Sequence, residues 1–324
     1  MEENTEQRVD LTLFSEKIQE LKDRIASVIV GQEQTVDLVL TAILANGHVL
    51  IEGVPGVAKT LLARLTARLI DADFSRDQFT PDLMPSDVLG TTVFNMKTNG
   101  FDFHQGPIFA DIVLVDEINR APAKTQAALF EVMEERQISI DGTTHRMGDL
   151  YTILATQNPV EQEGTYKLPE AQLDRFLMKI TMDYPSLEEE VNILERHHTN
   201  AALVKLDDIT PAITKEELLS LRAFMNQVFV DRTLLQYIAL IVQQTRTSKA
   251  VYLGASPRAS VAMLQSSKAY ALLQGRDFVT PEDIKFVAPY VLQHRLILTA
   301  EAEMEGYSPV KVTQRLIDKV EVPK

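Results

Sequence analysis

The sequence predicts an α/β protein in which a doubly wound parallel sheet is followed by a small, all-helical second domain. From the start of the chain to about residue 185, short β-rich runs alternate with stretches of helical periodicity, which is the pattern of βαβ units. Beyond residue 186 the predicted strands stop and only helical periodicity follows. The length of 324 residues also favours two domains, because single hydrophobic cores rarely grow larger.

Composition narrows the class of protein. Apolar residues make up 45% of the chain, enough for buried cores, but no apolar run approaches the length that spans a bilayer. The net charge of −14 argues against a sequence-independent nucleic-acid binder. The chain has no cysteine, which excludes disulfides, thiolate metal sites and cysteine nucleophiles. Because its first residues are acidic and polar, we expect a cytoplasmic protein without direct membrane insertion.

The first part of the chain contains five predicted strands separated by helices. The strands are expected at residues 48–52, 76–80, 111–116, 151–156 and 176–182. Helices with apolar residues at helical spacing are expected at residues 59–70 and 123–137. Two further stretches, residues 91–106 and 136–147, alternate around an Asn-Gly and an Asp-Gly dipeptide, so we expect two inserted β-hairpins.

The second part of the chain is predicted to be helical. The expected helices are residues 187–198, 214–230, 232–245, 256–274 and 280–295. Two of these begin with a hydroxyl residue followed by proline, Ser256-Pro257 and Thr280-Pro281, the pattern of an N-cap and first helical turn. We place the boundary near residues 185–205, with a first domain at 1–190 and a second at 205–324.

The octapeptide GVPGVAKT, residues 53–60, resembles a phosphate-binding loop. It follows a predicted strand and opens a predicted helix, so backbone N–H groups and the helix N-terminus can surround phosphate oxygens. Lys59 would reach the β- and γ-phosphates, and the Thr60 hydroxyl would ligate Mg²⁺. Ala58 replaces the usual second glycine, which costs about 1 kcal/mol only if its φ is positive. An ordinary strand-to-helix turn is the alternative.

Acidic residues follow the predicted strand of residues 111–116. The run IVLVDE ends in Asp116 and Glu117, which a buried parallel strand would deliver to the carboxyl edge of the sheet, where ligands bind in open α/β folds. Asp116 is suited to hold Mg²⁺, and Glu117 to polarise a water that attacks the γ-phosphate. The next strand ends at Asn158, whose amide can orient that water. A solvated acidic turn and a simple Asn-Pro turn are the alternatives.

Six stretches together resemble the MoxR family of AAA+ ATPases. They are VGQE (30–33), GVPGVAKT (53–60), FTPDLMPSDVLG (79–90), the block from Gly106 to Gln137, the block from Ala155 to Phe176, and SPRA (256–259). The resemblance covers roughly residues 25–300, and alanine before the loop lysine is usual in that family. It implies an AAA+ P-loop core with inserted hairpins, then a small helical lid, with the nucleotide in the cleft between them.

The resemblance also assigns roles to residues. Val30, Gly31 and Gln32 match the segment that passes the adenine of ATP. The phosphate loop of the family matches Gly53, Val54, Pro55, Gly56, Val57, Ala58, Lys59, Thr60 and Leu61.

Three further residues match sensor or finger positions of the family. Asn158 matches sensor 1, Arg258 matches sensor 2 of the lid, and Arg175 matches the arginine finger that acts on a neighbouring subunit's ATP. The alternative for Arg175 is a surface ion pair with Asp174 or Glu170, and for Arg258 a position in open solvent. Because a cation is disfavoured at a helix N-terminus, Arg258 is better explained by an anionic partner.

The resemblance implies an Mg²⁺-dependent ATPase in a homo-oligomeric ring, expected to be a hexamer. The ring would act as a chaperone-like motor that remodels or activates client proteins, or assists metal or cofactor insertion, with von Willebrand factor A domain proteins as partners. The inserted hairpins would contact clients or merely extend the sheet, and their few basic residues are sparse for a DNA-tracking pore. Alternatives are a chelatase ATPase subunit, a nucleic-acid translocase and a non-catalytic nucleotide-dependent scaffold.

Overall fold

A computed structural model describes residues 11–54, 56–158, 165–199 and 208–323. Five parallel strands form the central sheet in the order β2-β5-β8-β1-β9. Their bounds are β1 Val49–Gly53, β2 Phe74–Gln78, β5 Ile112–Asp116, β8 Thr152–Gln157 and β9 Met178–Met182. All five lie where they are predicted, and β2 begins two residues earlier than expected.

Both faces of the sheet are covered, which confirms the doubly wound prediction. Alternate residues of the buried strands belong to two different cores: Val49 and Ile51 pack with the helices on one face, and Leu50 packs with those on the other. The first face carries α1 Leu11–Val28, α2 Glu33–Leu44 and α3 Lys59–Leu69. The second face carries α4 Pro85–Leu89 and α5 Ala123–Glu135, with the short helices η1 Pro107–Phe109, η2 Ile118–Arg120 and α6 Glu170–Leu173.

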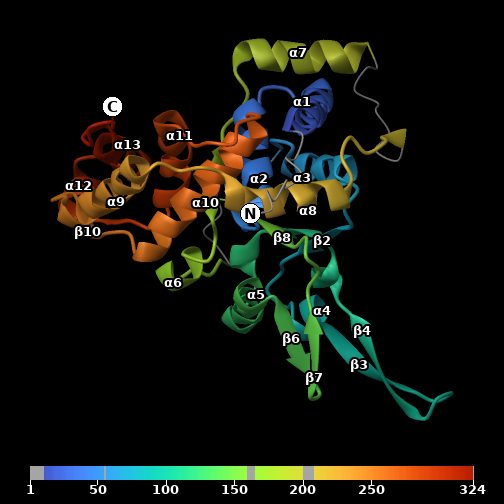
Figure 1. Cartoon of the computed structure of the whole chain (residues 1–324). Helices are drawn as coiled ribbons and strands as arrows, with labels where there is room; N and C mark the ends of the chain where they lie inside the picture. The colour runs from blue at the N-terminus through green and yellow to red at the C-terminus, as the bar shows by residue number, and fades with distance from the viewer. Residues whose placement is uncertain (1–10, 55, 159–164, 200–207, 324) are drawn as a thin grey trace, which may run out of the picture.

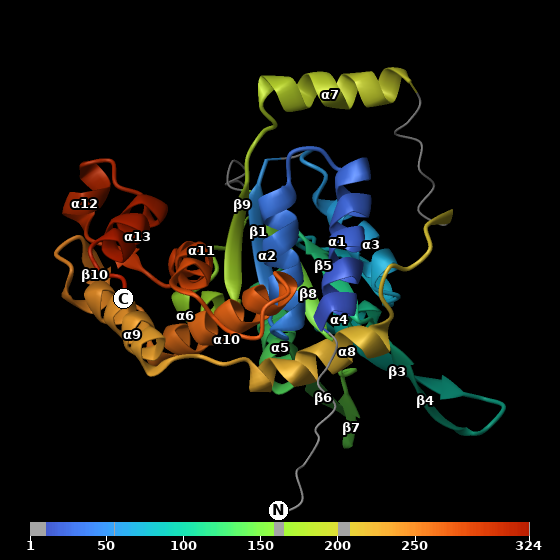
Figure 2. The same ribbon diagram turned by 45° about the horizontal axis from the view of Figure 1, so that its top comes forward.

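Two antiparallel hairpins project from the second face, as predicted (Figures 1 and 2). The first pairs β3 Gly90–Asn95 with β4 Gly100–Gln105, and the second pairs β6 Gln137–Ile140 with β7 Thr143–Arg146. The second turn has positive φ at both central residues, 50° at Asp141 and 80° at Gly142, which is the geometry that an Asp-Gly hairpin dipeptide favours.

The second part of the chain is a helical lid that packs against the first face of the sheet. Its helices are α8 Lys215–Phe224, η4 Met225–Gln227, α9 Arg232–Thr247, α10 Pro257–Leu273, α11 Pro281–Leu292, α12 Ala300–Met304 and α13 Pro309–Asp318. Helix α10 packs on α2, and α11 packs on β9, so lid and core share one hydrophobic cluster. Both predicted proline starts are confirmed, although only Thr280 of the two hydroxyl residues accepts a capping hydrogen bond.

The expectation of an all-helical lid requires one correction. Strands β10 Val251–Leu253 and β11 Ile297–Leu298 pair antiparallel within it. Strands of three and two residues are too short to show alternation in a sequence, and they pair only because α10 and α11 bring distant segments together. In the part of the chain that the structure describes, no helix is long and apolar enough to cross a membrane.

Helix α7, Leu187–His198, joins the core to the lid and has no buried residue. It lies across the ends of α1 and α2 that are nearest to the carboxyl edge of the sheet (Figure 2). Ser186 and Glu189 form a capping box at its start, in which the serine hydroxyl accepts from the Glu189 N–H and the Glu189 carboxylate accepts from the Ser186 N–H.

Candidate functional site

The phosphate loop connects β1 with α3 at the carboxyl edge of the sheet. Gly53 must lack a side chain, because a Cβ would lie 2.7 Å from the Met182 carbonyl oxygen on the adjacent strand β9. Gly56 has a φ of 88°, and Ala58 has a φ of 60°, so both adopt left-handed conformations that favour glycine. The structure therefore places Ala58 in the costly conformation, at about 1 kcal/mol. Pro55 lies outside the described residues.

The loop lysine points back into its own loop. Lys59 Nζ donates a hydrogen bond to the Gly53 carbonyl oxygen at 2.8 Å. Partial burial lowers the pKa of Lys59, while the nearby charges of Asp116 and Glu117 oppose that shift. The ammonium group is thus close enough to both acids to be influenced by them, which shows that the fold brings the two predicted motifs together.

Asp116 is buried at the end of β5 and accepts two hydrogen bonds. Arg76 Nε donates to Asp116 Oδ2 at 2.6 Å, and Thr156 Oγ1 donates to Asp116 Oδ1 at 3.2 Å. The same threonine hydroxyl accepts from the Glu117 backbone N–H at 3.0 Å. Neighbouring strands β2 and β8 therefore hold the orientation of this carboxylate from both sides.

Glu117 lies one residue beyond β5 in a left-handed conformation, with a φ of 56°. A non-glycine residue in this region is strained, and such strain is concentrated at functional sites. Its carboxylate oxygen Oε2 accepts from Gln78 Nε2 at 3.0 Å and pairs with Arg120 Nε at 3.0 Å. The side chain that the sequence marks as the water-polarising base is thus held at the edge of the sheet by two neighbours.

The order of the strands explains why these groups meet. Strand β8 lies between β5, which ends in the acids, and β1, which leads into the phosphate loop. Asn158 directly follows β8 and is 7% exposed, so it lies between the loop and the acids at the same edge. Thr60 is the second residue of α3, on the other side of the loop. The predicted phosphate, metal and water-orienting residues therefore share one edge.

The segment predicted to pass the adenine turns sharply between α1 and α2. Gly31 has a φ of 73°, and a Cβ on it would lie 2.2 Å from a carboxylate oxygen of Glu189 on α7. Gln32 accepts a hydrogen bond from the Thr35 hydroxyl through Oε1 at 2.8 Å. The sequence did not predict that α7 would contact this segment.

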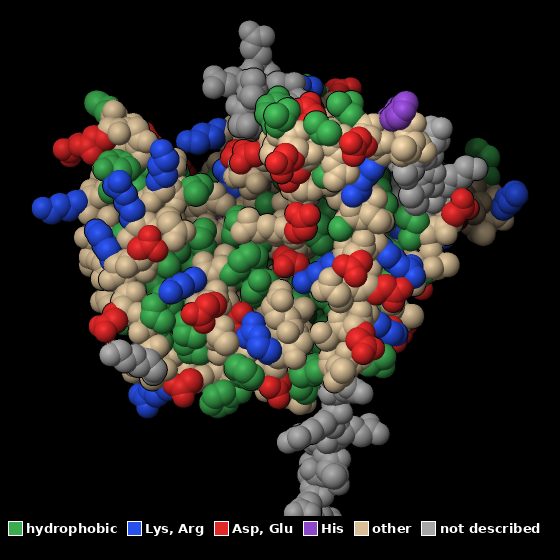
Figure 3. Space-filling view, turned by 90° about the horizontal axis from the view of Figure 1, so that it is seen from above, with side chains coloured by type: hydrophobic (Ala, Val, Ile, Leu, Met, Phe, Trp, Pro, Cys, Tyr) green, Lys and Arg blue, Asp and Glu red, His purple; other side chains and the backbone are tan. Residues whose placement is uncertain are grey.

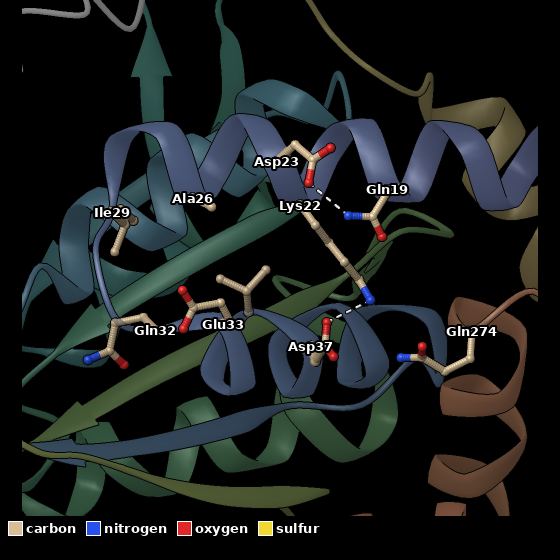
Figure 4. Close-up of a pocket in the computed structure, with 10 residues that line it drawn as sticks. Gln19, Lys22, Asp23, Ala26, Ile29, Gln32, Glu33, Asp37 and Gln274 are labelled. Carbon is tan, nitrogen blue, oxygen red and sulfur yellow. Dashed lines mark hydrogen bonds and ion pairs between the residues drawn. The ribbon is translucent and has the colours of Figure 1, made fainter. Parts of the chain in front are cut away.

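A groove of about 310 Å³ runs between α1 and α2, with Ile29 and Gln32 at one end and Gln274 at the other (Figure 4). An ion pair between Lys22 Nζ and Asp37 Oδ1, at 2.7 Å, crosses it. Its described lining contains no residue of the phosphate loop. The groove therefore adjoins the predicted adenine segment but is separate from the phosphate site.

The two predicted arginines meet at a single carboxylate. Arg258 Nη2 lies 3.3 Å from Glu134 Oε1, and Arg175 Nη1 lies 4.0 Å from Glu134 Oε2. Arg175 also donates to the Phe130 carbonyl oxygen. The acid paired with Arg175 is thus Glu134 rather than the alternatives Asp174 and Glu170, and Asp174 pairs with Arg295 at 2.6 Å. The anionic partner expected for Arg258 is present, and it is Glu134 at the end of α5.

These arginines line a pocket of about 460 Å³ at the opposite edge of the sheet from the phosphate loop. The pocket also includes Gly47 and His48, which precede β1, and Leu177, which precedes β9. A five-residue strand spans roughly 16 Å, so the pocket and the loop are about that far apart within one chain. Arg258 is therefore far from the phosphate loop of its own chain, because α10 begins at the amino edge of the sheet.

Four residues of the site were not singled out in the sequence. Arg76 and Gln78 both lie on β2, where the run FSRDQ is unusually polar for a strand, and Thr156 ends β8. Glu134 lies among several glutamates of α5. The polar sequence of β2 was the signal that could have identified Arg76 and Gln78. Charged and amide side chains on a strand indicate contacts with acidic residues at the end of a neighbouring buried strand.

Comparisons with known proteins agree with this geometry. Residues 48–178 match the model of the ATPase family associated with various cellular activities (AAA), and residues 243–318 match an AAA lid domain. The chain is 47% identical to the uncharacterized Bacillus subtilis protein YeaC (93% of both chains) and 44% identical to the chaperone MoxR1 of Mycobacterium tuberculosis (93% and 81%). A crystal structure of a candidate ATPase of Cytophaga hutchinsonii superposes with a TM-score of 0.89 at 40% identity, covering 97% of both chains.

Proposed function

This chain belongs to the MoxR family of AAA+ ATPases, and we propose that it hydrolyses ATP within a ring of identical subunits. Within one subunit, the loop N–H groups and Lys59 would hold the phosphates. Glu117 would polarise the attacking water, and Asn158 would orient it. Each of these groups lies at the carboxyl edge of the sheet.

The residues present fit a magnesium ion. Thr60 and Asp116 offer one hydroxyl and one carboxylate at the phosphate edge, a small set of oxygen donors that suits an ion which keeps waters and binds substrate phosphates. When bound, Mg²⁺ supplies positive charge to the transferred phosphoryl group. Arg76 donates a hydrogen bond to the Asp116 carboxylate. A metal that binds this carboxylate would therefore compete with Arg76 for it.

One observation carries the proposal of a ring. Arg175 and Arg258 lie at the amino edge of the sheet, about one strand length from their own phosphate loop, so neither can reach a nucleotide bound there. An arginine supplied by a neighbour can stabilise γ-phosphoryl charge and accelerates hydrolysis by about 10³ to 10⁵ in GTPases. We therefore assign both arginines to the adjacent subunit's ATP, and the ring is expected to be a hexamer.

We further propose that hydrolysis drives a chaperone-like motor that remodels or activates client proteins. The relative named chaperone MoxR1 supports this role. Metal or cofactor insertion and collaboration with von Willebrand factor A domain proteins are its expected forms. The net charge of −14 disfavours nucleic acid as the client.

Mixing two inactive variants tests the trans assignment. Neither Glu117→Gln nor Arg175→Ala alone should hydrolyse ATP, but equal mixtures should regain up to about a quarter of the wild-type rate, since a quarter of random interfaces pair an intact base with an intact finger. Persistent inactivity in mixed rings verified by mass would overturn action in trans. A wild-type rate as low as that of Glu117→Gln would instead favour a non-catalytic scaffold.

A variant that binds ATP but does not hydrolyse it can be used to identify the client protein. Glu117→Gln held in ATP should retain a collaborator in a pull-down, whereas Lys59→Ala should not, because it cannot bind the nucleotide. Stimulation of ATP hydrolysis by single-stranded DNA, measured in parallel, would favour the translocase alternative.

A further inference from the structure

Helix α7 is attached to the body of the protein through polar side chains, on the side of the helix that also carries the 41% exposed Ile193. Arg196 Nη1 donates to the carbonyl oxygens of Ala26 at 3.0 Å and Ser27 at 2.7 Å, and the Glu189 carboxylate lies against Gly31. Glu189 and Arg196 are seven residues apart, about two helical turns, so they share one face. That face is attached to the end of α1 and the turn that follows it.

The opposite face of α7 is apolar and points outward. Leu187, Val191 and Leu194 follow the i, i+4, i+7 spacing of one helical stripe and are 79%, 47% and 65% exposed. Leu187 is two residues from Glu189, about 200° around the helix, which places the stripe away from the body. Figure 3 shows hydrophobic side chains gathered on α7 with acidic ones beside them. We call Leu187, Val191 and Leu194 the α7 stripe.

This arrangement is the reverse of an ordinary surface helix, whose apolar side faces the core. A helix of 12 residues is marginal in water by itself and is normally stabilised by burying an apolar face. The attachments of α7 on its inner face are polar contacts, so they do not bury the stripe. A contiguous exposed apolar stripe with a polar surround is typical of a protein–protein interface.

We propose that the α7 stripe docks against a second copy of this chain, on the face that carries Arg175 and Arg258. The stripe is bordered by the carboxylates of Glu188, Glu190 and Glu195. The proposed receiving pocket has the complementary character: its lining contains four arginines against two carboxylates, with the 54% exposed Val261 beside Arg258 on α10. Apolar contacts at the centre and opposite charges around them favour this pairing.

The position of α7 agrees with this occupant. The helix is fastened to the segment before α2, at the phosphate edge, where the proposed function requires a neighbour's arginines. A neighbouring subunit that binds the α7 stripe would therefore place its arginine pocket next to the phosphate edge of the first subunit. The inference thus rests on the proposed function and adds the surface that would hold the two subunits in register.

Cysteine cross-linking tests the pairing directly, because the natural chain contains no cysteine. With ATP and a flexible bismaleimide, the double variant Leu194→Cys/Val261→Cys should give a ladder of species larger than dimers. Each single variant, and the control Leu194→Cys/Leu240→Cys, should remain uncross-linked. Dimers of the single Leu194→Cys variant would show α7 packing on α7 and overturn the assignment, as would absence of a ladder in the double variant.

Charge placed on the stripe tests its contribution to assembly. Val191→Glu/Leu194→Glu should weaken ATP-dependent association by at least about tenfold, or about 1.4 kcal/mol, in sedimentation. ATP hydrolysis at limiting chain concentration should fall with it. The matched control Leu235→Glu/Leu240→Glu alters two leucines of α9 that are 42% and 45% exposed, and it should behave as wild type.

The two proposals fail in different ways. Unchanged assembly of the stripe variant alongside normal wild-type hydrolysis overturns the docking inference and leaves the proposed function standing. Wild-type chain that remains monomeric with ATP, or fails to hydrolyse it, overturns both. Binding of a fluorescent ATP analogue to the stripe variant should match wild type, which separates lost assembly from a misfolded phosphate loop.

Discussion

The two edges of the central sheet are built differently. At the carboxyl edge, each functional group lies within a few residues of a strand end: the phosphate loop after β1, the acids after β5 and Asn158 after β8. At the amino edge, the arginine pocket combines α5, the segment after α6 and the start of α10, which are far apart in the chain. The first edge is encoded locally, whereas the second exists only when the lid has packed against the core.

Because the two edges carry different groups, ATP binding and ATP hydrolysis should respond differently to substitutions at each edge. The carboxyl edge holds the groups that would bind phosphate and polarise water, and the amino edge holds the cations that would complete a neighbour's site. A change at one edge should therefore leave the function of the other measurable.

Lys59→Ala should have the largest effect. The proposed contact of Lys59 with phosphate is lost together with its ammonium group, so ATP binding should disappear and hydrolysis should fall by more than about 10³-fold. Titration with a fluorescent ATP analogue measures binding, with the exposed Lys124→Ala on α5 as control. Unaltered affinity in Lys59→Ala would contradict the phosphate role of the loop.

Arg175→Ala should reduce hydrolysis by about 10³-fold and leave ATP affinity of the isolated subunit within about twofold of wild type. The reason is that this side chain lies at the amino edge of the sheet, away from the phosphate loop of its own chain. Steady-state hydrolysis and binding are measured on the same preparation, with the exposed Arg232→Ala as control. A large loss of affinity in the monomer would place Arg175 at its own phosphate loop.

The amino edge should carry an acid-sensitive contribution to stability. Burial and the charge of Arg136 lower the pKa of His48 from an ordinary 6.5 to about 3, and the hydrogen bond to the Met133 carbonyl opposes this shift only in part. Nδ1 accepts from the Ile153 N–H at 3.0 Å, so the folded state holds a neutral ring. Because the unfolded chain takes up a proton below pH 6.5, stability should fall by about 2 kcal/mol from pH 7 to pH 5 on account of this residue.

Urea unfolding of His48→Asn measures that contribution, since asparagine can still accept from the Ile153 N–H but does not titrate. The variant should lose stability less steeply than wild type between pH 7 and pH 5, whatever its stability at pH 7. Parallel curves for the two proteins would show that His48 is not the acid-sensitive group.

Ala58→Gly should stabilise the carboxyl edge by about 0.5–1 kcal/mol, because glycine adopts the φ of 60° at position 58 without strain. Its melting temperature should rise by a few degrees at most. Gly56→Ala is the opposite test and should destabilise, since the φ there is 88°. A less stable Ala58→Gly protein would mean that the methyl group makes a contact worth more than the strain.

Arg76→Gln should have the smallest effect. With its guanidinium pairing removed, the Asp116 carboxylate is freer to accept a metal, and the Mg²⁺ concentration for half-maximal hydrolysis should fall by about threefold. The effect is small because Arg76 is half exposed to water. A higher Mg²⁺ requirement would instead show that Arg76 positions the carboxylate for the metal.

Much of the carboxyl edge could be predicted from the sequence, because its signals are short. Lys59 and Thr60 follow a strand and open a helix, and Asp116 and Glu117 end an apolar run, so their approximate places follow from local patterns. Their partners could not be predicted. Arg76 and Gln78 contact the acids only through the pairing of β2 with β5, which nothing within either segment specifies.

The sequence alone determined the strands and helices of the sheet, the two hairpins, the phosphate loop and the acids, since hydrophobic periodicity and turn residues act over a few positions. It also identified Arg175 and Arg258 as residues of interest. Only the tertiary structure decided where they lie, that Glu134 joins them, and that α7 turns its apolar stripe outward. These features depend on how distant segments pack, and packing is a property of the whole fold rather than of any one stretch.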